Sequence, residues 1–447
     1  MKKTLKFFLE VNKLKTLLRT GWVLREVQNP ETIADHTFRV AIVAWLLGEK
    51  QNLNTTRIIK TALFHDLCEV YAGDVTPFFY YIDLPKDEEK RKKILMKWVR
   101  LSKKEKEKRG KKKWEVEEKS LLKLIKPLSP ELKKEILASW IDFEKGTTKE
   151  GKFTRPADKI DTLLQAIEYF GAGEETPVTG WWEEIEELTE DPLLLDFLTI
   201  IQNKFYGEKR KSAHKITDEN LKKGLEGILD FIWNVGKLKH LPRKLWVQLG
   251  VKNPESVAGH CFTLALMAWV FGKEKKELDM GKLLKMALCH ELPSVYTGDL
   301  ITPYGRILPR AKKERKKIFI KWPRLSKKEK EKKFLEDYQK EKTALKKLTQ
   351  KLSSSTREEI LQLFDEYKTA SSAEARFLNQ LNVLAVLFQA LLYQKEDKDL
   401  PIGFLWEWAL ERCDNKKCLD FLEALKNKFY GKGFIFKIFN LINFKKR

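Results

Sequence analysis

Apolar residues recur along the chain at the three- and four-residue spacing of amphipathic helices. One such stretch contains Phe38, Ala41, Ile42, Trp45 and Leu46. Sustained alternation of apolar and polar residues, which would indicate strands, is not found, and hairpin turn pairs are few. The pattern therefore predicts an all-α protein. Pro30, followed by Thr32 or Asp35 as a cap, predicts where this helix begins.

The helical pattern occurs twice. The stretch NPETIADHTFRVAIVAW ends at Trp45, and the similar NPESVAGHCFTLALMAW ends at Trp269, 224 residues later. A period this long exceeds the roughly 20 to 50 residues of solenoids and propellers, so each copy should form a domain with its own core. We expect a first domain over 1–210, a linker over 211–228, a second domain over 229–433 and a tail rich in Phe and Lys over 434–447.

The charge balance is basic, with 87 Lys and Arg against 64 Asp and Glu and a formal charge of +23. Such a surface attracts phosphates, including nucleic acid and anionic membranes. Much of the charge, however, lies in mixed runs such as RLSKKEKEK, at Arg100 and again at Arg324. Mixed runs are more typical of a solvated helix face, so we do not favour either partner. The tail could lie on an anionic membrane or dock on its own domain, and docking is the preferred interpretation.

Cysteine use and hydropathy predict a cytoplasmic protein. The five cysteines include no CxxC pair, which argues against a disulfide framework or a zinc knot. The N-terminus begins like a secretory signal, but Glu10 and Lys13 interrupt its apolar run. No uninterrupted apolar segment reaches the length of about 18 residues that a membrane span needs.

The histidines introduce chemistry. Four of the six histidines, His36, His65, His260 and His290, fall at equivalent places in the two copies. In the first copy Asp66 follows His65 directly, and Glu69 stands one helical turn further along. Two imidazoles and a carboxylate on neighbouring helices form a plausible site for a divalent cation. A single buried histidine, in contrast, is more often a hydrogen-bonded core residue.

A further oxygen ligand is expected from the helix ADKIDTLLQAIEY, which offers Asp158 and Asp161. Internal alignment pairs Asp158 with Asn382 and Asp161 with Ala385. An exchange of Asp for Asn keeps shape and polarity but removes the charge, as expected where a metal ligand has been lost. We therefore predict Asp158 as the ligand.

These residues also carry a family resemblance. RTGW from Arg19, NPETIADH from Asn29 and HDLCEVYAGD from His65 occur in an order that resembles the HD-domain superfamily, and within it the HD-domain 5′-deoxynucleotidases. The resemblance implies tandem HD-type helical domains, a nucleoside monophosphate substrate and one divalent metal ion, with Mn, Co, Mg, Zn and Fe all compatible with the ligands. It implies the following site residues: His36, His65, Asp66 and Asp158 as metal ligands, Glu69 and Asp74 as catalytic carboxylates, and Arg19, Trp22 and Arg25 as substrate-binding residues.

Elementary chemistry agrees with these roles. A carboxylate at Glu69 could orient or deprotonate a water, and Asp74 could protonate the leaving oxygen or position the sugar. Solvation or capping of a helix end is the alternative for both residues. Trp22 could be a base-stacking platform or a core residue.

The second copy departs from the pattern. Asp66 becomes Glu291, Glu69 becomes Ser294, and Asp158 becomes Asn382. We predict a folded but catalytically degenerate domain, which could take the place of a dimer partner and give an intramolecular pseudo-dimer. The leading function is a metal-dependent phosphohydrolase acting on nucleoside 5′-monophosphates. The alternatives are a non-catalytic nucleotide-binding or regulatory protein and another HD phosphohydrolase acting on a different phosphate ester.

Overall fold

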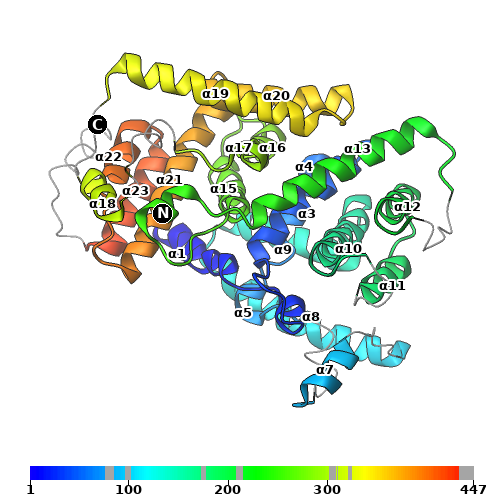
Figure 1. Cartoon of the computed structure of the whole chain (residues 1–447). Coiled ribbons are helices and arrows are strands. Elements are labelled where there is room, and N and C mark those ends of the chain that lie inside the picture. The colour runs from blue at the N-terminus through cyan, green and yellow to red at the C-terminus, as the bar shows by residue number, and fades with distance from the viewer. Residues whose placement is uncertain are drawn as a thin grey trace. The chain divides into compact units, whose positions relative to one another are not determined.

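The computed structural model describes residues 1–75, 85–95, 102–172, 178–207, 215–301, 309, 311–320 and 325–431. Across these ranges the regular elements are helices (Figure 1). The β-structure in the same ranges consists of two isolated bridges, Leu18 with Thr32 and Pro242 with Ser256. The predicted all-α class is confirmed. The predicted tail over 434–447 and the start of the predicted linker, 211–214, lie outside the described residues.

The chain forms two compact units. The N-terminal unit comprises Phe7–Lys239 with 351–353, and the C-terminal unit comprises Met1–Lys6, His240–Gln350 and Ser354–Arg447. The unit boundaries differ from the repeat boundaries, because residues 226–239 match residues 2–15 in the repeat yet belong to the N-terminal unit. The predicted domain limits describe the sequence repeat and remain a prediction for independently folding parts.

The N-terminal unit contains the following helices among its described residues. They are η1 (Asn12–Lys15), α2 (Thr20–Val23), α3 (Ile33–Lys50), α4 (Thr55–Phe64), α5 (Glu69–Ala72), α7 (Glu88–Leu95), α8 (Lys103–Ile125), α9 (Pro130–Lys145), α10 (Lys149–Phe170), α11 (Thr179–Leu188), α12 (Pro192–Tyr206), α13 (Glu219–Val235) and η3 (Gly236–Lys239). Helix α1 (Lys2–Val11) contains residues of both units.

Helices of the C-terminal unit repeat this order. They are α14 (Lys244–Leu249), α15 (Val257–Gly272), α16 (Met280–Cys289), α17 (Ser294–Thr297), α18 (Lys312–Ile320), α19 (Lys327–Thr349), α20 (Ser354–Thr369), α21 (Ala373–Glu396), α22 (Gly403–Arg412) and α23 (Lys416–Phe429).

Helix α3 is the centre of the N-terminal core. Every residue from Ile33 to Gly48 is buried, and the helix contacts α4, α10 and α13. Its counterpart α15 is buried from Val257 to Gly272 and contacts α16 and α21. Because polar residues on a central helix are removed from water, each needs a partner within the core.

One helix of the described part, α21, is long and apolar enough to span a membrane. Its most apolar window is 72% buried inside the protein, as in the core helix of a folded domain. The five cysteines are free and buried.

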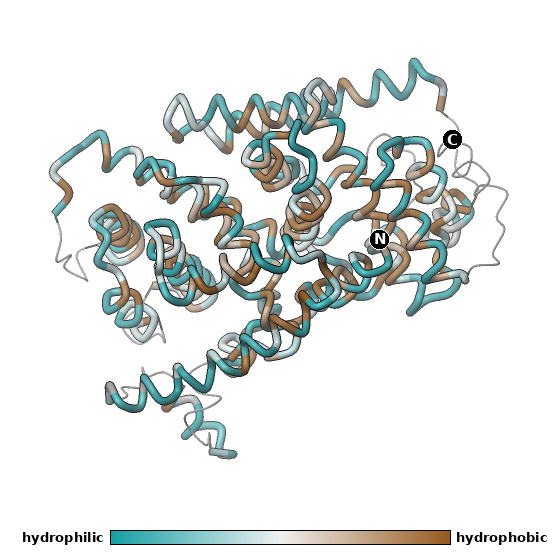
Figure 2. The backbone as a smooth tube through the Cα atoms, turned by 180° about the vertical axis from the view of Figure 1, so that it is seen from behind, coloured by the Kyte–Doolittle hydropathy of each residue, from teal (hydrophilic) through white to brown (hydrophobic). Residues whose placement is uncertain are grey.

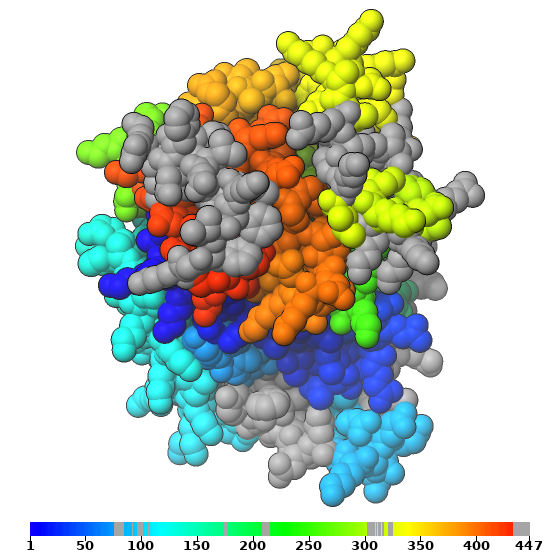
Figure 3. All heavy atoms as spheres, turned by 90° about the vertical axis from the view of Figure 1, so that its left-hand side faces the viewer, coloured from blue at the N-terminus to red at the C-terminus, as the bar shows by residue number. Residues whose placement is uncertain are grey.

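The last six residues of each mixed-charge run form the first turns of α8 and α19. Ser102 and Ser326 cap these helices, each in a capping box with the Glu three residues later. The described residues of both runs are mostly exposed, and hydrophilic residues dominate along the helices that carry them (Figure 2). Side chains of α19 stand at the surface in the space-filling view (Figure 3). The charge pattern thus corresponds to solvated helix faces.

Candidate metal and catalytic site

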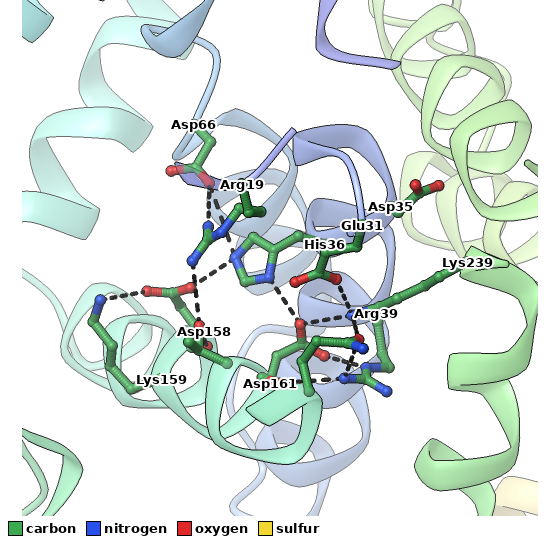
Figure 4. Close-up of polar contacts among 12 residues, drawn as sticks. Arg19, Glu31, Asp35, His36, Arg39, Asp66, Asp158, Lys159, Asp161 and Lys239 are labelled. Atoms are coloured by element: carbon green, nitrogen blue, oxygen red, sulfur yellow. Dashed lines mark hydrogen bonds and ion pairs between the residues drawn. The ribbon is translucent and has the colours of Figure 1, made fainter. Parts of the chain in front are cut away.

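His36 lies in the first turn of α3. Thr32 is the N-cap, and its side chain accepts a hydrogen bond from the Asp35 amide while the Asp35 carboxylate accepts one from the Thr32 amide. Both predicted caps therefore act together. The Asp35 side chain points away from His36, and the imidazole of His36 faces α10 (Figure 4).

His65 and Asp66 follow the end of α4. His65 and Glu69, expected one helical turn apart, do not lie on one continuous helix, since α4 ends at Phe64 and the single turn of α5 begins at Glu69. His65 Nδ1 lies 2.6 Å from the Ala62 carbonyl oxygen, which directs Nε2 toward Asp66. The turn between the helices brings both side chains to the same place.

Two aspartates of α10 lie on opposite sides of the His36 ring. Asp158 Oδ1 is 2.8 Å from Nε2, and Asp161 Oδ2 is 2.8 Å from Nδ1 (Figure 4). Their separation of three residues places both on the α10 face that meets α3. Asp158 shares the Nε2 side with His65 and Asp66, whereas Asp161 lies behind the ring.

The four predicted metal ligands converge. His65 Nε2 is 3.1 Å from Asp66 Oδ2 and 3.9 Å from Asp158 Oδ1, and His36 Nε2 is 3.9 Å from Asp66 Oδ2. Donor atoms around one cation, at about 2.1 Å from it, lie roughly 3 to 4 Å apart. Among the described residues, His65 Nε2 makes no hydrogen bond of good geometry although it is buried. The donor set thus fits a divalent cation.

Electrostatics keep these carboxylates ionised. Burial acts to raise the pKa of Asp158, but Lys159, 3.5 Å away, and His36 outweigh it and hold the pKa well below its ordinary range. Burial and Arg19 act to lower the pKa of His36, yet hydrogen bonds to the two aspartates of α10 raise it. Ionised carboxylates in an enclosed site favour a cation.

Glu69 lies beside this cluster with an unused oxygen. Its side chain is buried, and Oε2 has no hydrogen-bond partner among the described residues. Burial, followed by the charges of Asp66 and Asp74, raises the pKa of Glu69 well above its ordinary value. A carboxyl group with a raised pKa in an enclosed site is suited to proton exchange.

Asp74 and Arg19 contact one another at the edge of the cluster. Gly73 adopts a φ of 76°, which turns the chain after α5 and leads to Asp74. Asp74 Oδ2 accepts a 2.6 Å hydrogen bond from the Thr20 amide and lies 3.9 Å from Arg19 Nε. Arg19 Nη1 is 3.4 Å from Asp66 Oδ2. Asp74 therefore caps the start of α2, as in the alternative interpretation of this residue.

Trp22 and Arg25 do not join the ligand cluster. Trp22 is 2% exposed, and its indole donates a 2.9 Å hydrogen bond to Glu31 Oε1. Arg25 donates to the carbonyls of Gly21 and Leu95 and stacks on the Trp181 ring. The structure thus favours the core interpretation of Trp22 over a base-stacking platform, because an enclosed indole presents no face to a nucleotide.

Behind His36 lies a buried charge network that the sequence did not reveal. Arg39 pairs with Asp161, and Lys239 Nζ is 3.1 Å from Asp161 Oδ2 and 2.6 Å from Glu31 Oε2 (Figure 4). The exchange of Arg39 for Thr263 and of Asp161 for Ala385 between the copies was the available signal. The side chains of Arg39, Asp161, Glu31 and Lys239 are all 0% exposed.

The second copy builds a different site. His260, His290 and Glu291 approach one another, and Arg243 pairs with Glu291 as Arg19 pairs with Asp66. Asn382 Nδ2 donates a 2.8 Å hydrogen bond to the Tyr367 hydroxyl. Tyr367 replaces Phe143, which packs on His65 in the first copy. The amide that replaces Asp158 has thus acquired a neutral partner.

The helical fold and the buried cluster of two histidines and two aspartates define the class of protein. A family model described as HD domain matches residues 11–179 and again 235–404. The chain therefore belongs to the HD domain family, which confirms the resemblance.

Named relatives cover part of the chain. The human 5′-deoxynucleotidase HDDC2 is 32% identical over 165 residues, which are 37% of this chain and 67% of that protein. Its counterpart from Xenopus laevis is 34% identical over 169 residues, 38% of this chain and 70% of that protein. The 5′-deoxynucleotidase YGK1 of Saccharomyces cerevisiae is 32% identical over 160 residues, 36% of this chain and 63% of that protein.

Proposed function

We propose that the first copy is a metal-dependent phosphohydrolase that releases phosphate from nucleoside or deoxynucleoside 5′-monophosphates. The observation that carries the proposal is the convergence of the ligand atoms of His36, His65, Asp66 and Asp158. Beside them lies Glu69, whose Oε2 has no hydrogen-bond partner among the described residues. The similarity to proteins named 5′-deoxynucleotidase supports the substrate class.

The donor set is suited to one divalent cation of the series Mn, Co, Mg, Zn and Fe. When bound, such an ion polarises a phosphoryl oxygen and lowers the pKa of a coordinated water. His36 and His65 would supply neutral nitrogen donors, and Asp66 and Asp158 would supply charged oxygen donors. Hydrolysis of a phosphate monoester is extremely slow without such help.

Side chains around the cluster have separate tasks. Glu69 orients the attacking water and accepts its proton, since its unused Oε2 is enclosed beside the ligands. Arg19 lies 3.4 Å from Asp66 and provides a permanent positive charge for a phosphate oxygen. Asp74 holds Arg19 and the start of α2 in place. A direct role of Asp74 in proton transfer, and of Arg25 in substrate binding, stays a prediction.

The second copy is proposed to be non-catalytic. It has Ser294 in place of the proposed base and Asn382 in place of an aspartate ligand. The prediction that it takes the place of a dimer partner within one chain rests on the sequence repeat. A cytoplasmic location is likewise proposed, and nucleic acid or an anionic membrane is not favoured as a partner because the mixed-charge runs form solvated helix faces.

A phosphate-release screen tests the proposal. Purified wild-type protein is assayed on nucleoside and deoxynucleoside 5′-monophosphates with each of the five metals, before and after chelation. The variant Asp158→Asn copies the residue of the second copy and should lose at least about 100-fold in turnover. The matched variant Asn382→Asp should leave turnover unchanged. Full activity of Asp158→Asn would refute the ligand assignment, and no hydrolysis with any metal would refute the function.

A further inference from the structure

Residues 226–239 form a segment that belongs to the second copy by sequence and to the N-terminal unit in space. They match residues 2–15 of the first copy, and Lys239 matches Lys15. In the structure α13 contacts α3 and α12, and η3 also contacts α3. Lys239 is the last residue of this segment and reaches the network behind His36 (Figure 4).

Lys239 completes the charge balance of this network. Its ammonium donates to Glu31 Oε2 at 2.6 Å, to Gln165 Oε1 at 2.9 Å and to Asp161 Oδ2 at 3.1 Å. Arg39 also pairs with Glu168, whose side chain is 18% exposed. The fully buried part of the network contains two cations, Arg39 and Lys239, and two carboxylates, Glu31 and Asp161. Without Lys239 it would hold one uncompensated buried negative charge, which is costly in a protein interior.

Asp161 transmits this arrangement to the ligand cluster. The same Oδ2 atom that accepts from Lys239 lies 2.8 Å from His36 Nδ1. Histidines that bind metals usually donate their second ring nitrogen to a carboxylate, which fixes the tautomer and the ring orientation. Lys239 and Arg39 hold the two oxygens of Asp161 in the position that this bond requires.

Gly236, three residues before Lys239, indicates that residues 226–239 pack closely against the first copy. A Cβ at Gly236 would collide with the Arg39 guanidinium and would approach Glu168 Oε1 to 2.7 Å. The matching residue in the first copy is Asn12, and Arg39 is matched by Thr263 in the second. Glycine thus occurs where the segment passes the bulky arginine, which indicates that residues 226–239 are adapted to the active copy.

We propose that Lys239 is a positioning residue for His36, so that the second copy supplies part of the site of the first. The inference rests on the proposed metal-dependent function. Lys239 acts through Asp161, and its loss leaves all four metal ligands in the chain but loosens the orientation of one of them. The degenerate copy is therefore required for full metal affinity even though it contributes no ligand.

Manganese binding to the full-length protein tests this role. Mn(II) affinity and the EPR spectrum of the bound ion are compared for wild type, Lys239→Met and Lys237→Met. Lys237 lies on the same turn, is exposed and bonds to Asn234, so it is the matched control. We expect Lys239→Met to weaken Mn(II) binding about 10-fold and to broaden the EPR spectrum, and Lys237→Met to leave both unchanged.

A charge-balanced variant separates positioning from folding. Lys239→Met combined with Glu31→Gln removes one charge of each sign, so we expect the melting temperature to recover while Mn(II) affinity stays weak. An affinity equal to that of Glu31→Gln alone would show that Lys239 only neutralises Glu31, and would overturn the proposal. So would an unchanged affinity and spectrum in Lys239→Met. If the wild-type chain binds no metal, the proposed function itself fails.

An independent variant keeps Lys239 but displaces its segment. Gly236→Ala should weaken Mn(II) binding, because the added methyl group pushes η3 away from Arg39. Gly224→Ala is the control on α13, since a Cβ there meets only the Lys50 side chain at ordinary contact distance. Equal Mn(II) affinity in both glycine variants would contradict the inference.

Discussion

The two copies share a frame and differ in their charges. In each, a tryptophan indole donates to a glutamate whose amide donates to a tyrosine hydroxyl: Trp22, Glu31 and Tyr169 in the first copy, and Trp246, Glu255 and Tyr393 in the second. His65 and His290 each place Nδ1 against the carbonyl oxygen three residues earlier. Because these contacts persist in both, they belong to packing.

The differences are concentrated around the first histidine of each copy. Asp158, Asp161 and Arg39 surround His36, whereas His260 has Asn382, Ala385 and Thr263 at the matching positions. Asn382 donates a neutral hydrogen bond to the Tyr367 hydroxyl. The second copy folds without these charged side chains. We therefore infer that they serve the chemistry of the first copy. Asp74, in contrast, belongs to the shared framework. It accepts a hydrogen bond from the Thr20 amide, and its counterpart Asp299 accepts one from the matching Lys244 amide.

The largest effect on turnover should distinguish His65 from its counterpart His290. His65→Gln removes a proposed metal donor, and we expect kcat on the best nucleotide to fall at least about 1,000-fold, as loss of a catalytic cation costs several kcal/mol. His290→Gln changes the matching residue of the second copy and should leave kcat within about twofold. Steady-state kinetics of both variants measure the contrast. A large loss in His290→Gln would show that the second copy takes part in turnover.

A smaller effect is expected at the proposed base. Glu69→Gln keeps size and removes proton acceptance, so kcat should fall about 100-fold while bound metal per chain stays unchanged. Turnover and elemental analysis are measured on the same preparation. The converse variant, Ser294→Glu, should give the second copy no activity, because Asn382 remains in place of an aspartate ligand. Loss of metal in Glu69→Gln would instead identify Glu69 as a ligand.

Protonation should distinguish the copies as well. Burial lowers the pKa of His290 to about 4, so the folded protein binds this proton less readily than the unfolded chain. The contribution of His290 to stability is therefore present above its unfolded pKa of about 6.5 and is lost as the pH falls toward 4. At pH 5 the loss amounts to about 2 kcal/mol. The free energy of unfolding is measured with urea at pH 7 and pH 5. Its decrease between the two pH values should be smaller in His290→Gln than in wild type by this amount, and equal decreases would contradict the assignment.

Sequence reasoning reached the parts of this fold that local signals or the repeat could reveal. The cap at Thr32 follows from neighbouring residues, and the choice of Asp158 over Asp161 for the ligand position followed from comparing the copies. The same comparison contained the loss of Asp161 and Arg39, but an exchange to Ala gave no hint of a partner. Lys239 could not be predicted, because Lys15 occupies the same place in the repeat and the two copies therefore look alike at this position. No sequence pattern shows that residues 226–239 pack in the N-terminal unit.

The smallest effect tests whether the charges behind His36 serve the metal or the fold. The double variant Asp161→Ala with Arg39→Thr installs the residues of the second copy and removes one charge of each sign. Lys239 keeps Glu31 as its partner, and only the partly exposed Glu168 loses Arg39, so stability should change less than in Asp161→Ala alone. His36 loses the carboxylate at Nδ1, so metal affinity should fall about 10-fold. Isothermal titration with Mn(II) and thermal melts measure both quantities. Unchanged affinity in a stably folded double variant would assign Asp161 and Arg39 to packing, and the contrast between the copies would then reduce to the ligands and the base.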